Sequence, residues 1–513
     1  MSRYNRKHMF QKIIQPIEDF LNGITMYRLM LYFLIVLWIF VLFLSLFNIL
    51  PFNFQRFLFS SAIILTSCYL SNKIFSQVFK APTNLESVYI SALILIFIVL
   101  PAKNISDLVF IIVAAVFAMA SKYVLAIQRK HIFNPVAIAV FVTSLISLGY
   151  AGWWIGSQWT LLPILIGGLL IIKKIKRFNM VAAFLLTFFA ATFYFSFTNQ
   201  SDLVKTFQRI ILDSPILFFS FVMLVEPLTS PTRKKMQIIY GLLVGVLAGS
   251  QFSIGPIYST YETALIAGNI FAYIVGFKYR LVLTLVDKIK IAPNIFEFVF
   301  SPNKKFSYIP GQYFEWTLSH KNPDSRGVRR YFTIASSPTE EKIRLGVKFD
   351  QVKGSSFKRK FLSLEKGSKV YAGQLSGDFV LPKNTSEKLV FIAGGIGVTP
   401  MRSIVKNLID NKEKRDIVLF YTCSEPSEFV YKDIFDSARQ NGLKTVYVCS
   451  HPTPDWKGRI GRIDEKMIRE VEGFGDRTYY LSGPGSMVDS YKSLIRKMGI
   501  KPQRIVTDYF PGY

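Results

Sequence analysis

The chain contains few cysteines. Cys68, Cys423 and Cys449 are the only three among 513 residues, and they lie far apart in the sequence. An iron–sulfur cluster needs several thiolate ligands, and a zinc site needs a close group of ligands. The sequence therefore predicts no metal site of either kind within this chain, and no disulfide framework.

Histidines are also few. The chain has four, namely His8, His131, His320 and His451. Two haems that each take two histidines would need four of them within the membrane spans, and only His131 lies near a long apolar run. The sequence therefore argues against a haem-based membrane reductase.

Acidic residues are outnumbered by basic ones. The chain has 61 Lys and Arg but 33 Asp and Glu, which gives a formal net charge of +28. An excess of this kind is often found in proteins that bind nucleic acid. Here much of it sits in short loops between apolar runs, where membrane proteins carry their positive charge. Anionic lipid is a sufficient partner, so we expect a lipid bilayer and no nucleic acid.

Long apolar runs fill the first half of the chain, and hydrophobic residues make up 51% of the whole. Residues 29–278 are mostly apolar, whereas residues 279–513 resemble an ordinary soluble protein. The first apolar run is too long for the core of a signal peptide. The basic segment before it, residues 1–28, is expected to lie on the inner leaflet as an amphipathic lead.

A helix needs ~20 apolar residues to cross a bilayer. Ten runs are candidate spans: 29–50, 57–75, 86–102, 106–127, 134–150, 158–173, 179–197, 210–227, 236–250 and 262–278. With the N-terminus inside, the inside loops carry more Lys and Arg than the outside loops. The sequence therefore predicts a multi-pass protein of the cell membrane with about ten spanning helices, whose N-terminus and C-terminal half are both cytoplasmic.

Polar residues interrupt three of these runs. Asn134 precedes a proline at the start of the fifth run, residues 224–232 close the eighth, and Asn269 lies inside the tenth. Polar groups at membrane depth are costly and usually face the protein interior or a cavity. Each of the three, taken alone, is also typical of a helix cap.

Together and in this order, the three segments resemble the RnfD/NqrB-like membrane proteins, which belong to the Rnf complex and to the sodium-pumping NADH:quinone reductase. The resemblance covers roughly residues 110–278 and includes the pair Gly241 and Gly245. It implies a helix bundle that carries flavin and passes electrons across the membrane. The flavin is then expected near five polar residues: Asn134, Glu226, Thr229, Ser230 and Asn269.

The chain departs from that family at one place. The family carries covalent flavin mononucleotide (FMN) on a threonine in a long loop between spans five and six. Here the loop is only about residues 149–159 and holds no such acceptor. We therefore expect the second flavin, FMN or riboflavin, to be noncovalent.

The second half of the chain predicts two further domains. Residues 279–385 contain strand-like runs with regularly spaced turn signals, which is typical of a small antiparallel barrel. In residues 386–513 short apolar strands alternate with helical stretches, which is typical of a doubly wound parallel sheet. The sequence thus predicts a multi-domain chain: a polytopic helical membrane bundle, an antiparallel β-barrel and an α/β nucleotide-binding domain.

Residues 330–338 are the most informative stretch of the barrel. In a strand, Arg330 and Phe332 share one face, and Tyr331 and Thr333 share the other. An aromatic side chain suits packing on a flat ring, and a guanidinium suits pairing with a phosphate. This combination favours a flavin nucleotide.

The order of the two domains, with five motifs in sequence, resembles the ferredoxin–NADP reductase superfamily over about residues 279–513. Residues 330–336 are similar to its flavin motif, Arg-x-Tyr-Ser/Thr-x-x-Ser, with Phe332 in place of the tyrosine. Residues 353–357 look like its pyrophosphate loop, where small residues let backbone amides reach an anion. The resemblance implies bound FAD and these contacts to it: Gln312, Tyr313, Arg330, Phe332, Thr333, Ser336, Gly354, Ser355 and Ser356.

Residues 394–400 follow a strand and open a helix, so their glycines let a dinucleotide approach. Residues 482–487 resemble a late motif of the same superfamily. The expected nucleotide contacts are Gly394, Gly395, Gly397, Thr399, Pro400, Gly483 and Met487. For catalysis the resemblance implies Ser482, beside the nicotinamide, and Phe510 or Tyr513, which would cover the flavin ring until the nicotinamide displaces it. Taken singly, any of these glycines serves a turn equally well.

A 2′-phosphate on the nucleotide needs a cation after the second strand of such a domain. That position is occupied by Ser424 and Glu425. We therefore expect an FAD-dependent NAD(P)H oxidoreductase that prefers NADH. Its electrons would pass through FAD and the membrane flavin to an extracytosolic FMN-binding protein or a quinone. Two alternatives stay open: a component of a redox-driven ion pump, and a membrane-anchored reductase with no path across the membrane.

Overall fold

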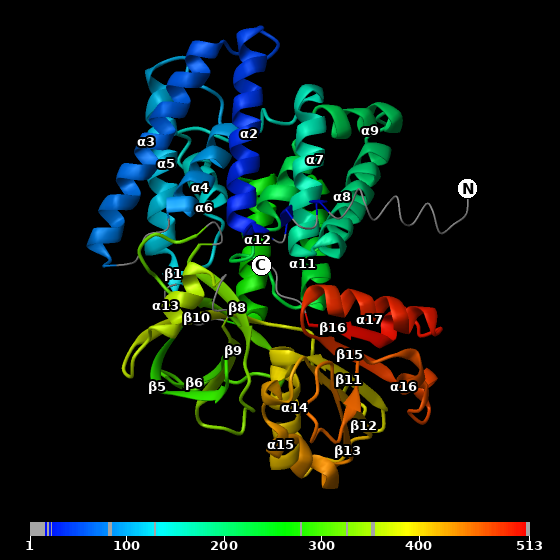
Figure 1. Ribbon diagram of the computed structural model, residues 1–513. Helices are drawn as coiled ribbons and strands as arrows, with labels where there is room; N and C mark the ends of the chain where they lie inside the picture. The colour runs from blue at the N-terminus through cyan, green and yellow to red at the C-terminus, as the bar shows by residue number, and fades with distance from the viewer. Residues whose placement is uncertain are drawn as a thin grey trace. The chain divides into compact units, whose positions relative to one another are not determined.

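The computed structural model describes residues 16–17, 20–21, 23–80, 85–127, 130–277, 280–324, 327–349 and 354–508. The chain divides into two compact units, and the division falls between Arg280 and Leu281. The first unit is mainly helical, and the second contains two six-stranded sheets (Figure 1).

The helices of the first unit are α2 (Met26–Leu46), α3 (Phe54–Val78), α4 (Leu85–Ile98), α5 (Ile105–Val124), α6 (Pro135–Leu145), α7 (Gln158–Ile175), α8 (Phe178–Thr198), α9 (Leu203–Leu212), α10 (Ile216–Phe218) with the π-helical turn η1 (Phe219–Met223), α11 (Lys234–Gly249) and α12 (Tyr261–Val275). Two hairpins join helices, β1 (Ala126–Ile127) with β2 (Lys130–His131) and β3 (Ser253–Ile254) with β4 (Ile257–Tyr258).

Polar side chains set where several of these helices begin. Thr25, Asn53, Asn104 and Thr260 each accept a hydrogen bond from the backbone amide three residues further on. This bond satisfies one of the amides that the first helical turn leaves without a partner. Such caps matter most in a bilayer, where no water replaces them.

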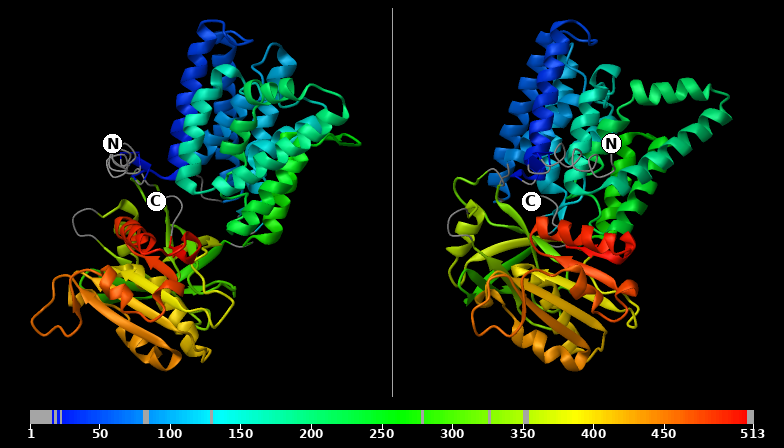
Figure 2. Two further views of the ribbon diagram at one scale, coloured as in Figure 1. Left: turned by 90° about the vertical axis from the view of Figure 1, so that its right-hand side faces the viewer. Right: turned by 45° about the vertical axis from the view of Figure 1, so that its right-hand side comes forward.

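Each predicted span overlaps a helix, but fewer than ten of the described helices are long and apolar enough to cross a bilayer. Among the described residues five are long and apolar enough, and a sixth is reached if α9 and α10–η1, which are bent by 58°, form one span. The five are α2, α3, α5, α7 and α8. Figure 2 shows at right how α9 runs across the direction of α8.

The prediction of ten full spans is therefore wrong. Helices α4, α6 and α12 have 14, 11 and 15 residues. At ~1.5 Å per residue, the longest of them covers about 22 Å of a ~30 Å hydrocarbon core. The sequence overestimates the lengths of these helices because apolar runs continue through the turns between them. Asp213 and Pro215 stand inside the predicted run 210–227, yet α9 ends at Leu212.

Glycines let α11 pack closely on α8. A Cβ atom at Gly241 would lie 2.4 Å from the carbonyl oxygen of Met180, and one at Gly245 would lie 2.4 Å from that of Phe184. The two glycines are four residues apart and therefore share one face of α11. Small residues at a crossing allow two helix backbones to approach.

The first domain of the second unit is a six-stranded antiparallel sheet. Its strands are β5 (Leu281–Ala292), β6 (Ile295–Pro302), β7 (Tyr313–Thr317), β8 (Arg329–Thr333), β9 (Ile343–Lys348) and β10 (Lys369–Ser376), in the order β8-β7-β10-β5-β6-β9. Helix α13 (Ser356–Leu362) packs on it, since the Phe361 ring lies 4.6 Å from Phe298 and 6.3 Å from Trp316.

The second domain is a parallel sheet with helices on both faces. Its elements are β11 (Leu389–Gly394), η2 (Gly395–Val398), α14 (Thr399–Asp410), β12 (Ile417–Cys423), α15 (Lys432–Ser437), β13 (Leu443–Cys449), β14 (Arg459–Ile460), α16 (Glu465–Arg469), β15 (Thr478–Ser482), α17 (Gly485–Lys497) and β16 (Ile505–Thr507). The order is β14-β13-β12-β11-β15-β16. The two apolar cores take α14 and α15 on one face and α16 and α17 on the other, so the predicted doubly wound fold is confirmed.

The strand order reverses at β11, which lies between β12 and β15. In open sheets of this type, ligands bind at the carboxyl ends of the strands beside such a reversal. The segment that follows β11 is residues 394–400, and the segment that follows β15 is residues 482–487. The topology therefore brings the two predicted nucleotide motifs to one edge.

Candidate functional site

Arg330 lies on β8 with 3% of its side chain exposed. Its Nη2 donates to Asp324 Oδ1 at 3.3 Å, and its Nη1 donates to the Gly327 carbonyl at 3.2 Å. The guanidinium carbon lies 5.3 Å from the centroid of the Phe357 ring. The Phe332 ring, two residues along the strand, lies 6.0 Å from the same ring. Arg330 and Phe332 therefore share one face, as a strand requires.

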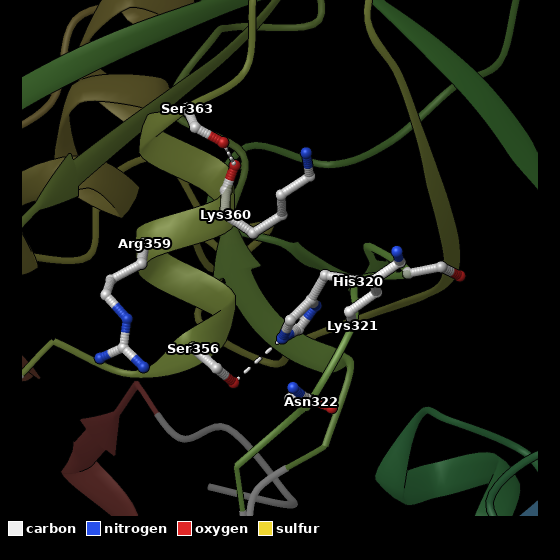
Figure 3. Close-up of a pocket in the computed structure, with 8 residues that line it drawn as sticks. His320, Lys321, Asn322, Ser356, Arg359, Lys360 and Ser363 are labelled. Carbon is white, nitrogen blue, oxygen red and sulfur yellow. Dashed lines mark hydrogen bonds between the residues drawn. The ribbon is translucent and has the colours of Figure 1, made fainter.

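A hollow of ≈730 Å³ opens between α13 and the segment that follows β7. It is lined by Ser319, His320, Lys321, Asn322, Ser356, Arg359, Lys360 and Ser363 (Figure 3). Ser356, Lys360 and Ser363 are three or four positions apart and share one face of that helix, and Arg359 is the neighbour of Lys360. None of the lining residues is acidic and three carry a positive charge, so the hollow suits an anion.

Ser356 connects this hollow to Arg330. His320 Nδ1 lies 2.9 Å from the Leu318 carbonyl, which can only accept, so Nδ1 carries a proton, and Nε2 lies 3.0 Å from the Ser356 hydroxyl (Figure 3). Ser356 Oγ accepts from the Asp324 amide at 2.9 Å, and Asp324 Oδ2 accepts from the Ser356 amide at 2.8 Å. One chain of hydrogen bonds thus joins His320, Ser356, Asp324 and Arg330.

Three other predicted flavin contacts lie on or beside β7 and β8. Tyr313 and Thr333 are partners in the register of these two strands. Gln312 is buried, and its Oε1 accepts from the Ile309 amide at 2.9 Å. Its backbone carbonyl also accepts from the Ile334 amide at 3.0 Å. The structure therefore brings residues 312–313 and 333–334 together.

Three predicted flavin contacts remain: Ser336, Gly354 and Ser355. The polar atoms of Ser336 and Ser355 are hydrogen-bonded within the protein. Ser336 is fully buried, its carbonyl accepts from Tyr308 Oη at 3.0 Å, and its hydroxyl lies 3.1 Å from the same atom. Burial raises the pKa of the Tyr308 phenol far above its ordinary value, so the phenol stays protonated and can donate. Gly354 precedes Ser355, whose hydroxyl accepts from the Lys358 amide and caps α13.

The two nucleotide motifs touch through their glycines. A Cβ atom at Gly394 would lie 2.2 Å from Met487 Sδ, and one at Gly397 would lie 2.5 Å from the Gly483 Cα. Gly395 has a φ of +53°, which favours glycine. Larger residues are therefore excluded at 394 and 397, and the two loops pack against each other at the edge where β11 and β15 end. Thr399 and Pro400 begin α14 directly after this turn.

Asp508 connects β8, which carries the predicted flavin motif, to the parallel-sheet domain. Its Oδ2 accepts from Thr333 Oγ1 at 3.3 Å and from Ser482 Oγ at 3.2 Å. Its own amide donates to the Leu481 carbonyl at 3.0 Å. The sequence did not indicate Asp508 as a site residue, because a single acidic residue after a three-residue strand belongs to no recognisable motif. Phe510, predicted to cover the flavin ring, lies outside the described residues.

In the helical unit the five predicted residues meet in one network. Asn134 donates from its amide nitrogen to Asn269 Oδ1 and from Nδ2 to Glu226 Oε2, both at 2.8 Å. Thr229 Oγ1 donates to the same Glu226 oxygen at 3.0 Å, and Asn269 Nδ2 donates to the Thr229 carbonyl at 3.0 Å. Ser230 donates to the Glu226 carbonyl. Segments far apart in the sequence are thereby tied together.

Asn134 is at the same time a helix cap, because its Oδ1 accepts from the amides of Val136 and Ala137. The sequence left the cap and the site as alternatives, and the structure shows the cap and the cluster together. Three further residues join the network: Arg177 bonds to Ser230, Tyr240 Oη lies 3.3 Å from Asn269 Nδ2, and His131 Nε2 lies 3.7 Å from Glu226 Oε1. The sequence did not single out Arg177, because it stands among the basic residues of a loop, and the positive charge expected in such loops already accounts for it.

Comparison with known proteins gives two family matches. Residues 144–276 match the NQR2, RnfD, RnfE family, and residues 391–493 match the oxidoreductase NAD-binding domain. Among curated relatives, a flavohemoprotein of Bacillus subtilis is 26% identical over 208 residues, which is 39% of this chain and 51% of the relative. A flavohemoprotein of Oceanobacillus iheyensis is 26% identical over 235 residues, which is 44% of this chain and 58% of the relative. The chain thus spans about half the length of the curated relatives it matches.

Solved structures similar to this chain include the cytochrome P450 reductase GcoB of Amycolatopsis, at 22% identity and a TM-score of 0.41, which covers 45% of this chain and 69% of that chain. The cytochrome b5 reductase domain of Ulva prolifera nitrate reductase has the same identity and TM-score and covers 45% of this chain and 97% of that domain.

Proposed function

We propose that this chain, which joins a membrane domain like those of the NQR2, RnfD, RnfE family to a ferredoxin-reductase-like NAD-binding domain, carries electrons from cytosolic NADH across the membrane. The observation that carries the proposal is the direct fusion of the two domains. Helix α12 ends at Val275 and β5 begins at Leu281, so only residues 276–280 separate the last helix of the first unit from the antiparallel sheet.

The first domain of the second unit offers a fitting site for FAD. Arg330 and the cations of the hollow are the donors that a diphosphate requires, and the hydrogen bonds from His320 to Asp324 hold this donor set in place. FAD, when bound, accepts a hydride from a nicotinamide and gives up its electrons singly. The protein would bind and orient both cofactors, with no side-chain base needed for the hydride itself.

The nucleotide edge fits a dinucleotide for a separate reason. A Cβ atom at Gly395 would meet no other atom within 4 Å, so the backbone there is free to approach a ligand, and Ser482 stands at the end of the neighbouring strand. The Asp508 carboxylate fixes the direction of the hydroxyl protons of Thr333 and Ser482. It would thus orient two polar groups.

We infer that NADH is preferred over NADPH. Ser424 and Glu425 follow β12, the neighbour of β11 in the sheet, and both side chains are exposed. A carboxylate here repels a 2′-phosphate. A Michaelis constant for NADPH well below that for NADH would contradict this inference.

In the membrane unit we propose a noncovalent FMN or riboflavin beside the network of Asn134, Glu226, Thr229, Ser230 and Asn269. The family match includes four of these residues, and the fifth, Asn134, is hydrogen-bonded to two of them. Buried polar groups in a membrane helix usually serve a function. The final acceptor would be an extracytosolic FMN-binding protein or a quinone, with the N-terminus and the reductase unit in the cytoplasm.

The test is the flavin content of the purified full-length chain. Acid precipitation followed by chromatography should release one FAD and one further flavin per chain, with none bound covalently. Arg330→Ala should lose FAD alone, and Asn269→Ala should lose the second flavin alone. A chain that holds FAD and no second flavin would be a membrane-anchored reductase, and the electron path would be wrong.

A further inference from the structure

We propose that Arg402 and Glu340 are positioning residues that set the distance between the flavin and the nicotinamide. The inference rests on the proposed function above. Arg402 lies in the first turn of α14, which directly follows the nucleotide loop at residues 394–398. Glu340 lies four residues after Ser336, the last residue of the flavin motif. The pair therefore joins the two segments that must hold the two cofactors.

Two successive residues of α14 bond to two successive carbonyls of the flavin segment. Arg402 Nη1 donates to the Ala335 carbonyl at 3.0 Å, and Ser403 Oγ donates to the Ser336 carbonyl at 2.6 Å. Both bonds are buried. The start of α14 is thus fixed to the backbone of the flavin motif at two adjacent points.

Glu340 holds the Arg402 side chain in this position. Arg402 Nη2 donates to Glu340 Oε1 at 3.1 Å, and Nη1 bonds to the other carboxylate oxygen. Glu340 also accepts from the Ser337 amide at 2.7 Å and from Arg344 Nε at 3.0 Å. The carboxylate is therefore fixed by the flavin segment and by β9, and the guanidinium cannot shift without breaking a two-point contact.

A half-buried aromatic ring closes the other side of Arg402. Its guanidinium carbon lies 5.6 Å from the centroid of the Tyr431 ring, and 5% of its side chain is exposed. Tyr431 adopts a φ of +61°, which a tyrosine rarely takes. The ring reaches β9 of the flavin domain, since a Cβ atom at Gly346 would lie 2.8 Å from Tyr431 Oη.

Stability alone is a weak reason for this arrangement. Buried ion pairs contribute little net stability, because desolvation offsets the attraction. Hydride transfer, in contrast, depends steeply on geometry, and a misplacement of ~1 Å costs about a hundredfold in rate. The two-point contact between Arg402 and Glu340 keeps the two binding segments at a fixed distance, which is what hydride transfer requires.

The test compares Arg402→Lys and Glu340→Gln with Lys406→Gln in the full-length chain loaded with FAD. Lys406 pairs with Asp410 one turn further along α14, where both side chains are more exposed. A lysine keeps the charge at 402 but cannot make the two-point contact, and the glutamine keeps the shape of Glu340 if the first variant folds poorly. FAD content and the NADH dissociation constant report whether each variant is intact.

We expect the rate constant for flavin reduction at saturating NADH to fall about tenfold or more in both variants, with FAD content unchanged. The long-wavelength absorbance of the nicotinamide–flavin complex, which depends on ring overlap and not on turnover, should weaken in parallel. Lys406→Gln should match the wild type in both. Unchanged rate and absorbance with a lower melting temperature would make the pair merely structural and overturn the inference. A wild-type flavin that NADH does not reduce would overturn the proposed function as well.

Discussion

His320 lines the hollow and connects it, through a chain of hydrogen bonds, to Arg330 on β8. Its Nε2 lies 3.0 Å from the Ser356 hydroxyl, and Ser356 and Arg330 both bond to Asp324. Removing the ring frees the Ser356 hydroxyl and loosens the carboxylate that holds the cation. A lost neutral hydrogen bond costs ~0.5–1.5 kcal/mol, so His320→Ala should raise the FAD dissociation constant about three- to tenfold.

The measurement is a titration of flavin-depleted full-length protein with FAD. Ser363→Ala is the matched control, because Ser363 lines the same hollow but its hydroxyl donates to the Lys360 carbonyl of its own helix. Equal FAD affinities in both variants would show that His320 does not support the flavin site.

Glu340 gives the second unit a defined response to acid. Burial alone would raise the pKa of this carboxyl, but hydrogen bonds and charge from Arg402, with help from the Ser337 amide and Arg344, outweigh it and lower the pKa below its ordinary 4.5. The stability that Glu340 contributes is therefore present above pH ~4.5 and is lost as the pH falls through the lowered pKa.

We expect the melting temperature of the FAD-loaded chain, followed by flavin fluorescence, to fall more steeply below pH ~4.5 in the wild type than in Glu340→Gln. Above that value the variant should be the less stable of the two, because it lacks the charge that pairs with Arg402. Parallel pH profiles for the two proteins would rule out this carboxyl as a source of acid sensitivity.

At the scale of elements, the sequence was most informative where a pattern repeats or a motif is complete. The alternation of strands and helices after residue 386 predicted the doubly wound sheet, and the glycines at 394 and 397 marked its ligand edge. Helix lengths in the membrane unit were less predictable. Apolar composition does not report a turn, and so α4, α6 and α12 are shorter than their apolar runs.

Residues that act through a partner far away in the sequence were the hardest to predict. Thr333 and Ser482 are each part of a motif, but their meeting at Asp508 requires the fold. Asn134, Glu226 and Asn269 were predicted as one site because a family resemblance linked them. Arg177 and Tyr240, which join the same network, have ordinary neighbours in the sequence and could be found only from the fold.

At the scale of the whole molecule, the question is whether electrons given to the second unit reach the far side of the bilayer. The hydrocarbon core is ~30 Å thick, and residues 29–278 contain one histidine, His131, which is too few for a pair of bis-histidine haems. A flavin beside the network of Asn134, Glu226 and Asn269 is the carrier that the family match supports.

Sealed vesicles with the reductase unit outward and ferricyanide trapped inside provide the measurement, since NADH does not cross the bilayer. The wild type should reduce the trapped acceptor, and Arg330→Ala should reduce neither trapped nor external acceptor because it lacks FAD. Asn269→Ala should still reduce external acceptor but lose most of the reduction inside. If the wild type, with both flavins present, reduces only external acceptor, then the helical unit is an anchor and the electrons leave on the cytoplasmic side.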